Sequence, residues 1–455
     1  MTGLGRVLVA NRGEIAVRTI RACHALGVEA VAVYSDADEH SRWVRIADHA
    51  VHIGRSAASK SYLDGEALLK AAKQSECDAV HPGYGFLSES AEFARAVLDA
   101  GLVFVGPTPE AIERMGDKAT ARRTARDAGV PVVPGSGAVA DLAEAEAAAG
   151  DVGYPMLIKA AAGGGGRGIR PVRDGAELAA VLPSAQAEAR SAFGDGTTYL
   201  ERAIPHARHI EVQVLADEHG NAVHLFERDC SVQRRRQKLI EEAPAPGLHE
   251  VTRQAITTAA VRLAHHVGYR GAGTVEFLVD AEENYYFIEM NTRVQVEHPI
   301  TEAITGVDVV AEQLRIAGGA PLSFAQDEVD RRGAAVELRI NAEDPDHDFA
   351  PSPGTIERLD LPGGPGVRVE TGVVRGDRIS PFYDSLIAKL VCWGADRDQA
   401  YARARQALAE LELEGVHSTV PLHRRLVADA ELRAGPVHTL WLEQRLGERP
   451  ADADR

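Results

Sequence analysis

The chain has 455 residues, which is enough for about three domains. Its 50 basic and 67 acidic residues give a formal net charge of −17, which excludes a nucleic-acid binder held by a broadly basic face. No apolar run approaches the length of about 18 residues that a membrane-spanning helix needs, and the apolar stretch before Asn11 is too short for a signal peptide. The four cysteines are widely spaced and form no CxxC pair. We therefore expect an acidic cytoplasmic enzyme that binds neither nucleic acid nor a membrane.

Strand and helix signals alternate over the first 115 residues. Short apolar runs predict buried strands, and the segments between them carry apolar residues at helical spacing. The predicted strands cover residues 6–10, 30–33, 78–80 and 102–105, and the predicted helices cover 14–27, 64–73 and 89–100. This alternation predicts a doubly wound parallel sheet of the α/β class.

Strand signals dominate the rest of the chain, which we assign to the α+β class. After an Ala/Glu-rich helix at 141–149, strands are predicted at 156–160, 168–172, 197–201, 209–215, 222–227, 273–279 and 285–291. A third block begins near residue 333, with a strand at 334–341, short β segments up to 391, and closing helices at 396–411 and 422–432.

A run of four glycines lies between two predicted strands: Gly163, Gly164, Gly165 and Gly166. Because glycine has no side chain, the backbone N–H groups of such a run can approach phosphate oxygens closely. Lys159, just before the run, adds a charge that neutralises a phosphate. A flexible linker is the alternative, but strand signals flank the run on both sides. Neither a GK[ST] sequence nor a GxGxxG motif with a helix is present, so the predicted phosphate loop is neither a Walker A loop nor a dinucleotide fingerprint.

The last two strands of the second block are close enough in sequence to form a hairpin. A turn centred on their polar connection places Glu276 opposite Glu289 and Thr274 opposite Asn291. Two carboxylates directly across strands repel each other, and a divalent cation with oxygen ligands, Mg²⁺ or Mn²⁺, removes that penalty. The alternative is a solvated polar face with salt bridges to lysines. The same alternation predicts one common apolar face, formed by Phe277, Val279, Ile288 and Met290.

Polar residues continue at every second position beyond this hairpin: Glu289, Asn291, Arg293, Gln295 and Glu297. In an extended segment they all point to one side, with Met290, Val294 and Val296 in the core. Such a row suits a site for a metal and an anion, with an acid or base at its far end. At about 3.3 Å per residue, an extended chain would separate Glu289 from Glu297 by about 26 Å, which is too far for both to act at the same phosphate; if both do, the chain must bend after Asn291.

Basic side chains cluster at residues 234–236 and at Lys238, which makes a local anion trap in an acidic chain. The alternative is an exposed basic face that Glu241 and Glu242 balance, and it is favoured for Arg234 taken alone. Lys118, at the start of a predicted helix, is by itself best explained as a solvated lysine.

A further polar face follows the strand at 334–341. Glu337, Arg339 and Asn341 alternate there with apolar residues. The histidines, by contrast, form neither HxxxH nor HExxH, which argues against a catalytic zinc site.

Nine segments along the chain form a recognisable set. They are ANRGEIA (10–16), HPGYGFLSE (81–89), MGDK (115–118), KAAAGGGGRG (159–168), ERDCS (227–231), EEAPAP (241–246), YRGAGTVEF (269–277), FIEMNTRVQVEHPITE (287–302) and RINAEDP (339–345). With them the sequence resembles the biotin carboxylase family of the ATP-grasp superfamily, over nearly the whole chain to about residue 446. FIEMNTRVQVEHP is highly specific to biotin-dependent carboxylation, whereas a generic ATP-grasp enzyme shares only its metal-binding part.

The resemblance implies three domains. Residues 1–114 would form a Rossmann-like N-terminal domain, residues 115–330 an ATP-grasp domain with a mobile lid at about 132–203, and residues 331–447 a C-terminal biotin carboxylase domain. The lid would carry the glycine run, close over ATP and exclude water.

The resemblance also implies an ATP site with two Mg²⁺ or Mn²⁺ ions. Lys118 and Lys159 would hold the nucleotide phosphates together with the glycine run. The adenine would meet Glu201 and the Ile204 backbone, and the metal ions would meet Glu276, Glu289 and Asn291. Further residues expected near the adenine are His209, Gln233 and Leu278.

The chemistry implied by the resemblance has two stages. Lys238, Arg293, Gln295 and the Val296 backbone would hold bicarbonate while Glu297 deprotonates it, and phosphoryl transfer from ATP would give carboxyphosphate. Carboxyphosphate would release CO₂, and phosphate would take the N1′ proton of biotin. In this second stage Arg339, with Tyr84 in the biotin pocket, would stabilise the biotin enolate.

The sequence departs from the family pattern at two positions. Arg236 stands where the bacterial type usually has histidine, so a cation is kept and a titratable group is lost. Ala162 stands in a place that is often glycine, which changes the backbone freedom of the predicted phosphate loop.

The sequence also carries no biotin attachment site. None of the four methionines is followed by lysine, as an AMKM-like turn requires. We therefore expect biotin on a separate carrier protein, a separate carboxyltransferase, and a homodimer as is usual in the family. The chain is either a free-standing subunit or part of a longer one.

The leading hypothesis is the biotin carboxylase subunit of an acetyl- or acyl-CoA carboxylase, in fatty acid biosynthesis. The first alternative is a component of a pyruvate or a urea/guanidine carboxylase. A second alternative, from another class, is a non-catalytic nucleotide-binding scaffold. The presence of Glu297, Arg293 and Lys238 argues against the scaffold.

Overall fold

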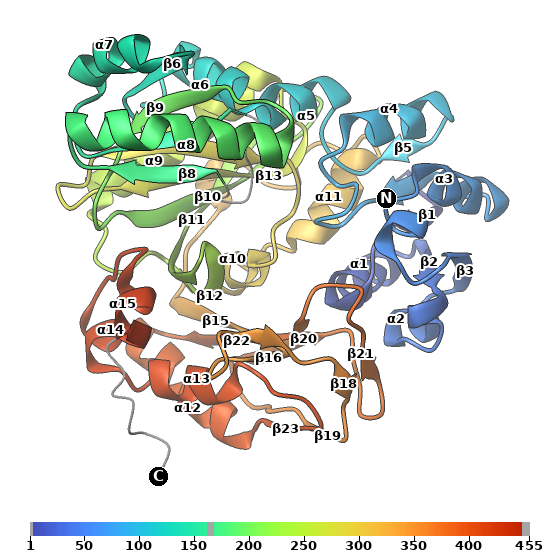
Figure 1. The fold of residues 1–455 in the computed structure, drawn as a ribbon. Helices are drawn as coiled ribbons and strands as arrows, with labels where there is room; N and C mark the ends of the chain where they lie inside the picture. The colour runs from blue at the N-terminus through green and yellow to red at the C-terminus, as the bar shows by residue number, and fades with distance from the viewer. Residues whose placement is uncertain (1–2, 162–167, 448–455) are drawn as a thin grey trace.

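The computed structural model describes residues 3–161 and 168–447. The glycine run at 163–166 and Ala162 lie outside the described residues. No helix within the described ranges combines the length and the apolarity needed to cross a bilayer. All four cysteines are buried and unbridged. Figure 1 shows the chain running from the blue N-terminal part through a green and yellow middle to an orange and red C-terminal part.

The N-terminal part contains a five-stranded parallel sheet, ordered β3-β2-β1-β4-β5, as the alternating signals predict. Alternate residues of β1 pack into two different apolar clusters, Val7 and Val9 on one face and Leu8 on the other. Both faces are therefore covered, which explains the unbroken apolar run. The sequence analysis missed β3 because this edge strand is largely exposed and carries two histidines. The elements are β1 (Arg6–Val9), α1 (Gly13–Ala25), β2 (Glu29–Ser35), α2 (Arg42–Ile46), β3 (His49–Gly54), α3 (Gly65–Gln74), β4 (Ala79–His81), α4 (Ala91–Asp99) and β5 (Val103–Phe104).

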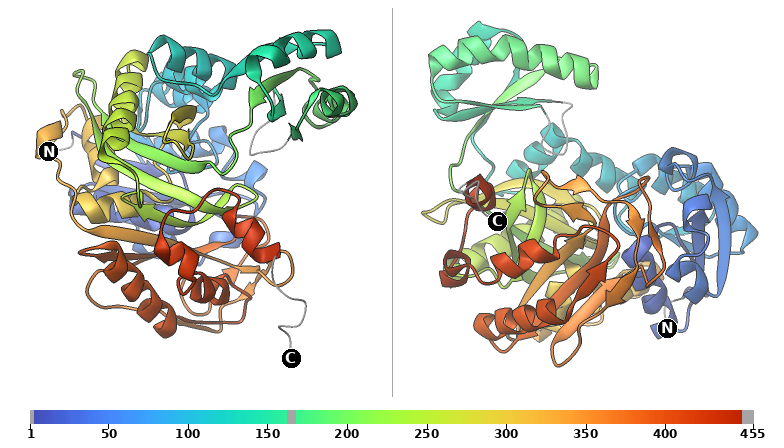
Figure 2. Two further views of the ribbon diagram at one scale, coloured as in Figure 1. Left: turned by 90° about the vertical axis from the view of Figure 1, so that its left-hand side faces the viewer. Right: turned by 60° about the horizontal axis from the view of Figure 1, so that its bottom comes forward.

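A small unit of four antiparallel strands and two helices follows, and Figure 2 shows it projecting from the rest of the molecule. We call residues 135–202 the lid unit. The sequence analysis missed α8 because its buried face mixes Leu178 and Leu182 with alanines, which weakens the periodic signal. Two helices lead into the lid unit, α5 (Pro109–Gly116) and α6 (Lys118–Asp127). Its elements are β6 (Gly135–Val139), α7 (Leu142–Val152), β7 (Met156–Ala160), β8 (Ile169–Val172), α8 (Gly175–Phe193) and β9 (Thr198–Arg202).

One eight-stranded antiparallel sheet, ordered β14-β13-β10-β11-β12-β15-β22-β20, joins the middle of the chain to the C-terminal part. Since β12 pairs directly with β15, side chains from both parts share one surface of this sheet. Figure 1 shows these strands crossing the centre of the molecule. They are β10 (Arg208–Ala216), β11 (Ala222–Arg234), β12 (Gln237–Ala243), β13 (Gly271–Val279), β14 (Tyr285–Asn291), β15 (Ala334–Asn341), β20 (Val367–Thr371) and β22 (Leu386–Gly394).

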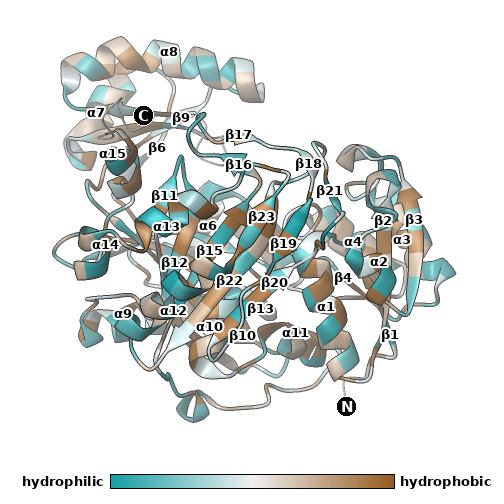
Figure 3. Ribbon diagram, turned by 90° about the horizontal axis from the view of Figure 1, so that it is seen from below, coloured by the Kyte–Doolittle hydropathy of each residue, from teal (hydrophilic) through white to brown (hydrophobic). Residues whose placement is uncertain are grey.

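Helices and short strands complete this body. In Figure 3, brown apolar residues gather along β20 and β22, whereas the short outer strands β19 and β23 are mostly teal. The helices are α9 (Glu250–Val267), α10 (His298–Thr305), α11 (Val309–Ala317), α12 (Arg397–Glu410), α13 (Val420–Leu426), α14 (Ala430–Ala434) and α15 (Trp441–Gly447). The short strands are β16 (Glu343–Asp344), β17 (Ala350–Pro351), β18 (Gly354–Thr355), β19 (Arg358–Asp360), β21 (Arg378–Ile379) and β23 (Glu412–Glu414).

The single helix predicted at 422–432 is wrong, because α13 and α14 are separate. Asp429 caps α14 by accepting hydrogen bonds from the backbone N–H groups of Glu431 and Leu432. A capping residue with extended backbone interrupts the helical run at that point.

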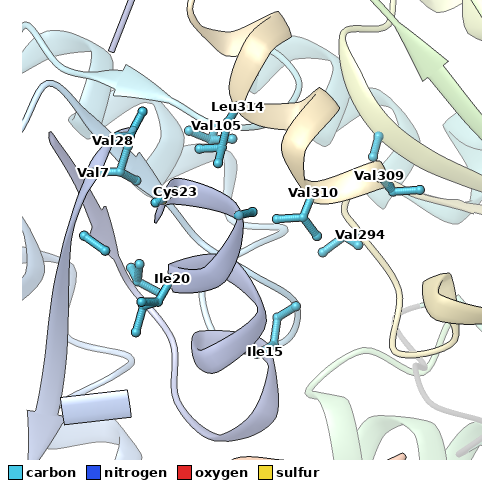
Figure 4. Close-up of a cluster of buried hydrophobic side chains, with 14 of the residues drawn as sticks. Val7, Ile15, Ile20, Cys23, Val28, Val105, Val294, Val309, Val310 and Leu314 are labelled. Atoms are coloured by element: carbon cyan, nitrogen blue, oxygen red, sulfur yellow. The ribbon is translucent and has the colours of Figure 1, made fainter. Parts of the chain in front are cut away.

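An apolar cluster ties the N-terminal sheet to the body, as Figure 4 shows. Ile15 and Ile20 of α1 belong to the same cluster as Val309 and Val310 of α11. Val294, from the loop that follows β14, is fully buried in this cluster. Burial of one valine contributes about 1.5–3 kcal/mol, so this contact holds the loop in place.

Candidate active site

The hairpin of β13 and β14 has the predicted register. Glu276 pairs with Glu289, and Thr274 pairs with Asn291. The two carboxylates therefore lie across from each other on neighbouring strands, as the alternation of side chains predicts.

The predicted apolar face of this hairpin is wrong at one residue. The register shifts after Glu276, so that Phe277 pairs with Phe287 and Ile288 is the extra residue of a β-bulge. Phe287 is buried in the core beside Met290, whereas Ile288 is only half-buried.

The predicted bend is confirmed. β14 ends at Asn291, and the chain leaves extended geometry before α10 begins at His298. The turn returns Glu297 to the sheet, where its Oε1 lies 2.6 Å from the Nζ of Lys238.

The prediction that Val296 lies in the core is wrong. Its side chain is half-buried, and its carbonyl accepts a hydrogen bond from the Lys389 Nζ at 2.8 Å. The same Nζ lies 3.0 Å from the Glu14 Oε2, and the other oxygen of Glu14 accepts a hydrogen bond from Tyr84. This chain of contacts connects the loop to Tyr84, which the resemblance places in the biotin pocket.

Lys238, on β12, is at the centre of the site. Its Nζ lies 2.6 Å from the Glu211 Oε2, 2.6 Å from the Glu297 Oε1 and 3.2 Å from the Glu276 Oε1. Burial lowers the pKa of Lys238, but its acidic neighbours outweigh burial and hold that pKa well above its usual value. Lys238 is therefore a permanent positive charge among three buried carboxylates.

The sequence analysis missed two members of this group, Glu211 and Arg228. Arg228 is fully buried, and its Nε donates to the Glu211 Oε1 at 2.6 Å. Its other N–H groups hold four polar side chains: Gln213, Thr274, Gln295 and Thr301. Alternating polar residues at 209, 211 and 213, inside a strand that was predicted, were the available signal for Glu211.

Arg339 completes the group from β15. Its Nη2 lies 3.0 Å from the Glu297 Oε2, and its Nε lies 2.5 Å from the Glu241 Oε1. Burial and the Glu211 charge raise the pKa of Glu297, but Lys238 and Arg339 outweigh them and hold it below its usual value. Glu297 is therefore an ionised carboxylate at neutral pH. We call these six residues the floor of the site: Glu211, Arg228, Lys238, Glu276, Glu297 and Arg339.

The three predicted metal ligands lie together, and one of them, Glu276, belongs to the floor. The Asn291 Nδ2 donates to the Glu276 Oε1 at 2.8 Å. Burial raises the pKa of Glu289, and the neighbouring Glu276 charge raises it further. Negative charge is thus in excess at this point, and a carboxylate pair with an amide oxygen is the donor set that Mg²⁺ or Mn²⁺ prefers. The residues therefore fit the metal that the sequence predicts.

His209, expected near the adenine, lies against the same acids. Its Nε2 is 3.1 Å from the Glu276 Oε2. Burial lowers the pKa of His209, but the Glu276 charge outweighs this and raises it to about 9. His209 is therefore a second fixed cation beside Glu276.

Arg293, expected to hold bicarbonate, is fixed at the rim by contacts with two side chains and with the Val294 carbonyl. Its Nε donates to the Glu89 Oε2 at 2.9 Å, and its Nη2 donates to the Asn291 Oδ1 at 2.7 Å. The Glu89 Oε1 also accepts from the Thr292 N–H at 3.1 Å. Glu89, which the sequence analysis quoted in a motif without a role, therefore orients this part of the loop.

The expected phosphate lysines lie on the lid side of the site. Lys159, on β7, contacts the carboxylate of Glu201 on β9, which Arg122 of α6 also contacts. Burial lowers the pKa of Lys159. Lys118 starts α6, and its charge acts to lower the pKa of Glu289, so it faces the metal ligands.

The remaining residues expected near the adenine come from three elements. Leu278 is the cross-strand partner of His209, and Gln233 is the cross-strand partner of Lys238. Ile204 lies in the loop between β9 and β10.

The basic cluster divides between two roles. Arg235 and Arg236 form the turn between β11 and β12, with φ of 46° and 66°. Arg234 and Arg235 both pair with Asp348, and the Arg234 guanidinium also lies 4.2 Å from the Phe349 ring centroid. The exposed basic face favoured for Arg234 alone is therefore wrong, because its side chain is only 12% exposed and contacts the C-terminal part.

The expectation that Glu241 and Glu242 balance this cluster is wrong. Glu241 contacts Arg339, and Glu242 contacts Arg397 at 2.5 Å. Both acids lie on β12 and are buried, and both partners belong to the C-terminal part.

Comparison with known proteins identifies the family of the chain. Residues 3–112 match the biotin carboxylase N-terminal domain, residues 117–325 the ATP-binding domain of the carbamoyl-phosphate synthase L chain, and residues 337–444 the biotin carboxylase C-terminal domain. The biotin carboxylase of Nostoc sp. is 51% identical over 440 residues, 96% of this chain and 98% of that protein. A pyruvate carboxylase subunit from Methanothermobacter thermautotrophicus is 49% identical over 440 residues, 96% of this chain and 89% of that protein.

Solved structures give the same result. The biotin carboxylase domain dimer of Hydrogenobacter thermophilus 2-oxoglutarate carboxylase, bound to MgADP, ADP and bicarbonate, is 47% identical with a TM-score of 0.92 and covers 98% of this chain and 99% of that one. The Campylobacter jejuni biotin carboxylase is 43% identical with a TM-score of 0.93 and covers 97% and 99%. Similar to these proteins in sequence and in fold over nearly its whole length, the chain belongs to the biotin carboxylase family, ATP-grasp ligases that carboxylate biotin with ATP, Mg²⁺ and bicarbonate.

Proposed function

We propose that this chain carboxylates biotin on a separate carrier protein by way of carboxyphosphate. The contacts of Glu297 are the single observation that carries this proposal. One oxygen of Glu297 meets Lys238 and the other meets Arg339, so one carboxylate links a bicarbonate-binding cation to a biotin-binding cation.

In the first stage, bicarbonate binds between Lys238 and Arg293, with Gln295 and the Val296 backbone, and Glu297 removes its proton. Burial alone favours the protonated form of Glu297. As bicarbonate draws Lys238 away from this carboxylate, the basicity of Glu297 therefore rises at the moment it is needed. The oxygen of bicarbonate then attacks the γ-phosphate, which gives carboxyphosphate and ADP.

Glu276, Glu289 and Asn291 would hold the two Mg²⁺ ions, which supply charge neutralisation at the phosphates. Lys118, Lys159 and the glycine run hold the phosphates, and Glu201, Ile204, His209, Gln233 and Leu278 surround the adenine side. Arg236 keeps a cation at a position where the family usually has histidine.

In the second stage, carboxyphosphate releases CO₂ and phosphate takes the N1′ proton of biotin. Arg339 stabilises the negative charge that develops on the ureido oxygen, and Tyr84 lines the pocket. N1′ then attacks CO₂, which gives carboxybiotin.

The carrier protein, a carboxyltransferase and a second copy of this chain are the proposed partners. The dimer of the Hydrogenobacter thermophilus domain supports a homodimer here. An acyl-CoA is the proposed final acceptor. The similarity to the pyruvate carboxylase subunit from Methanothermobacter thermautotrophicus keeps pyruvate as a second candidate, because both reactions share this carboxylation of biotin.

The test is ATP cleavage with and without bicarbonate and free biotin. We expect cleavage that depends on bicarbonate, increases with biotin and yields carboxybiotin. Stimulation by urea or guanidine in place of biotin favours the alternative carboxylase, and an absence of cleavage under all conditions favours a non-catalytic scaffold.

A further inference from the structure

The carboxylate of Glu201 binds two cations where the lid unit joins the body. Its side chain is only 7% exposed. The Lys159 Nζ contacts one oxygen, Oε1, and the Arg122 guanidinium contacts the other, Oε2. Because the two cations use different oxygens, Lys159 can leave while Arg122 stays.

The three residues belong to two bodies. Lys159 and Glu201 lie on β7 and β9, which pair within the lid unit. Arg122 lies on α6, outside the lid unit, and its Nη2 also donates to the Val133 carbonyl at 2.6 Å, just before β6. Arg122 therefore contacts both the strand that ends the lid unit and the segment that leads into it.

Lys159 has two competing partners in the proposed function. It is assigned to the nucleotide phosphates, yet in this structure its ammonium lies against Glu201. If Lys159 were the sole partner of Glu201, its departure would leave an uncompensated buried charge, which is strongly unfavourable. The contact with Arg122 removes that penalty. The planar guanidinium of Arg122 donates to the Glu201 carboxylate and to the Val133 carbonyl at the same time.

We infer that Arg122 is a positioning residue for nucleotide binding: it stays on Glu201 as the counter-charge, so that Lys159 is free to transfer from this carboxylate to the phosphates. The inference rests on the proposed assignment of Lys159 to the phosphates. The sequence analysis gave Arg122 no role, because one arginine on an amphipathic helix carries no pattern of its own.

The test is calorimetric binding of MgADP to four forms of the chain: wild type, Arg122→Met, Glu201→Gln and the double variant. Arg122→Met should weaken binding by about tenfold or more, because Glu201 then retains Lys159. In the Glu201→Gln background the carboxylate is gone, so the same Arg122→Met change should cost less than about threefold.

Two further variants separate this role from a structural one. Arg123→Met removes an exposed arginine of the same helix and should leave the affinity unchanged. Arg122→Lys keeps the positive charge but loses the planar guanidinium, so it should recover part of the MgADP affinity that Arg122→Met loses. Far-UV circular dichroism and thermal melting establish that each form is folded. In the double variant residue 201 is neutral, so the removal of Arg122 leaves no uncompensated charge there.

Two results would overturn the inference. One is wild-type affinity in Arg122→Met, and the other is an equal loss in both backgrounds, which would mean that Arg122 acts through Val133 alone. Failure of the wild-type chain to bind MgADP overturns the proposed function together with the inference. Normal wild-type binding with an unaffected Arg122→Met variant overturns only the inference.

Discussion

The floor and the lid unit hold their charges in different ways. In the floor, Lys238 contacts three carboxylates and Arg228 holds five side chains, so each of these cations keeps several partners when one contact changes. In the lid unit, Lys159 shares a single carboxylate with one arginine. A fixed network preorganises a reaction, whereas an exchangeable pair suits the binding and release of a nucleotide.

The apolar packing also differs between the floor and the lid unit. The loop that carries Glu297 is anchored by Val294, whose cluster extends into the N-terminal sheet. The apolar cluster of the lid unit, by contrast, contains only residues of the lid unit among those that the structure describes. The apolar core of the lid unit is therefore separate from the core that supports the floor, as the proposed motion of a lid requires.

The largest effect is expected from the replacement of Glu297, the proposed base in the floor. Glu297→Ala should lower both bicarbonate-dependent ATP cleavage and biotin carboxylation by about 100- to 10,000-fold, because carboxyphosphate never forms. Both rates are measured under saturating MgATP, with Glu282→Ala in the exposed hairpin turn as a control. A Glu297→Ala enzyme that still cleaves ATP in strict dependence on bicarbonate would give the role of base to another residue.

Arg339→Ala should separate the two stages. Loss of one charge contact to the enolate should lower biotin carboxylation by about 100- to 1,000-fold, while bicarbonate-dependent ATP cleavage largely survives at neutral pH. Arg332→Ala, which alters an exposed arginine, serves as the control. Equal losses in the two assays would place Arg339 in the first stage instead.

The same variant should change the pH dependence of ATP cleavage. Glu297 works as a carboxylate, so the rate falls as the pH drops through its pKa. In the wild type, Lys238 and Arg339 hold that pKa below its usual value. Removal of Arg339 raises it, and the acid limb of the rate profile should move to higher pH. An unmoved limb would show that this contact does not set the basicity of Glu297.

The next largest effect is expected at Glu289, a proposed metal ligand that lies across from the floor residue Glu276. Glu289→Gln should leave the fold intact and lower Mg-dependent turnover by about 100-fold or more, because the divalent charge is no longer balanced. Turnover is measured over a range of Mg²⁺ concentrations, alongside circular dichroism. Near-normal activity at saturating Mg²⁺ would mean that Glu289 is a salt-bridge partner and not a ligand.

The smallest effect concerns the motion of the lid unit. Amide hydrogen exchange in peptides that span β7 and β8 should slow by several-fold when a non-hydrolysable ATP analogue binds. Peptides from the floor strands β10 and β13 should change less and serve as an internal control. Unchanged exchange in β7 and β8 at saturating nucleotide would argue against a lid.

Local patterns predicted the parts of the site that lie close together in sequence. The pairing of Glu276 with Glu289 follows from alternation and the position of one turn, and the bend before Glu297 follows from chain length together with the base role assigned to Glu297. The bulge at Ile288 was not predictable, because an extra residue in a strand carries no compositional signal here.

Sequence patterns did not predict the contacts between segments that lie far apart in the chain. Lys238 meets Glu211 because β10 and β12 both flank β11, and that order is set by the pairing of the whole sheet. Resemblance to the family supplied roles for Lys238 and Arg339 without their partners. Glu211, Arg228 and Arg122 became visible only when the sheet and the lid unit brought them to the site.

A structure with a non-hydrolysable MgATP analogue and bicarbonate tests the contrast between the two regions most directly. We expect Lys159 to lie on the phosphates with Arg122 still on Glu201, and bicarbonate to lie beside Lys238, Arg293 and Glu297. The contacts of Arg228 should be unchanged. Lys159 still bound to Glu201 above an occupied nucleotide site, or bicarbonate bound away from Glu297, would contradict this account.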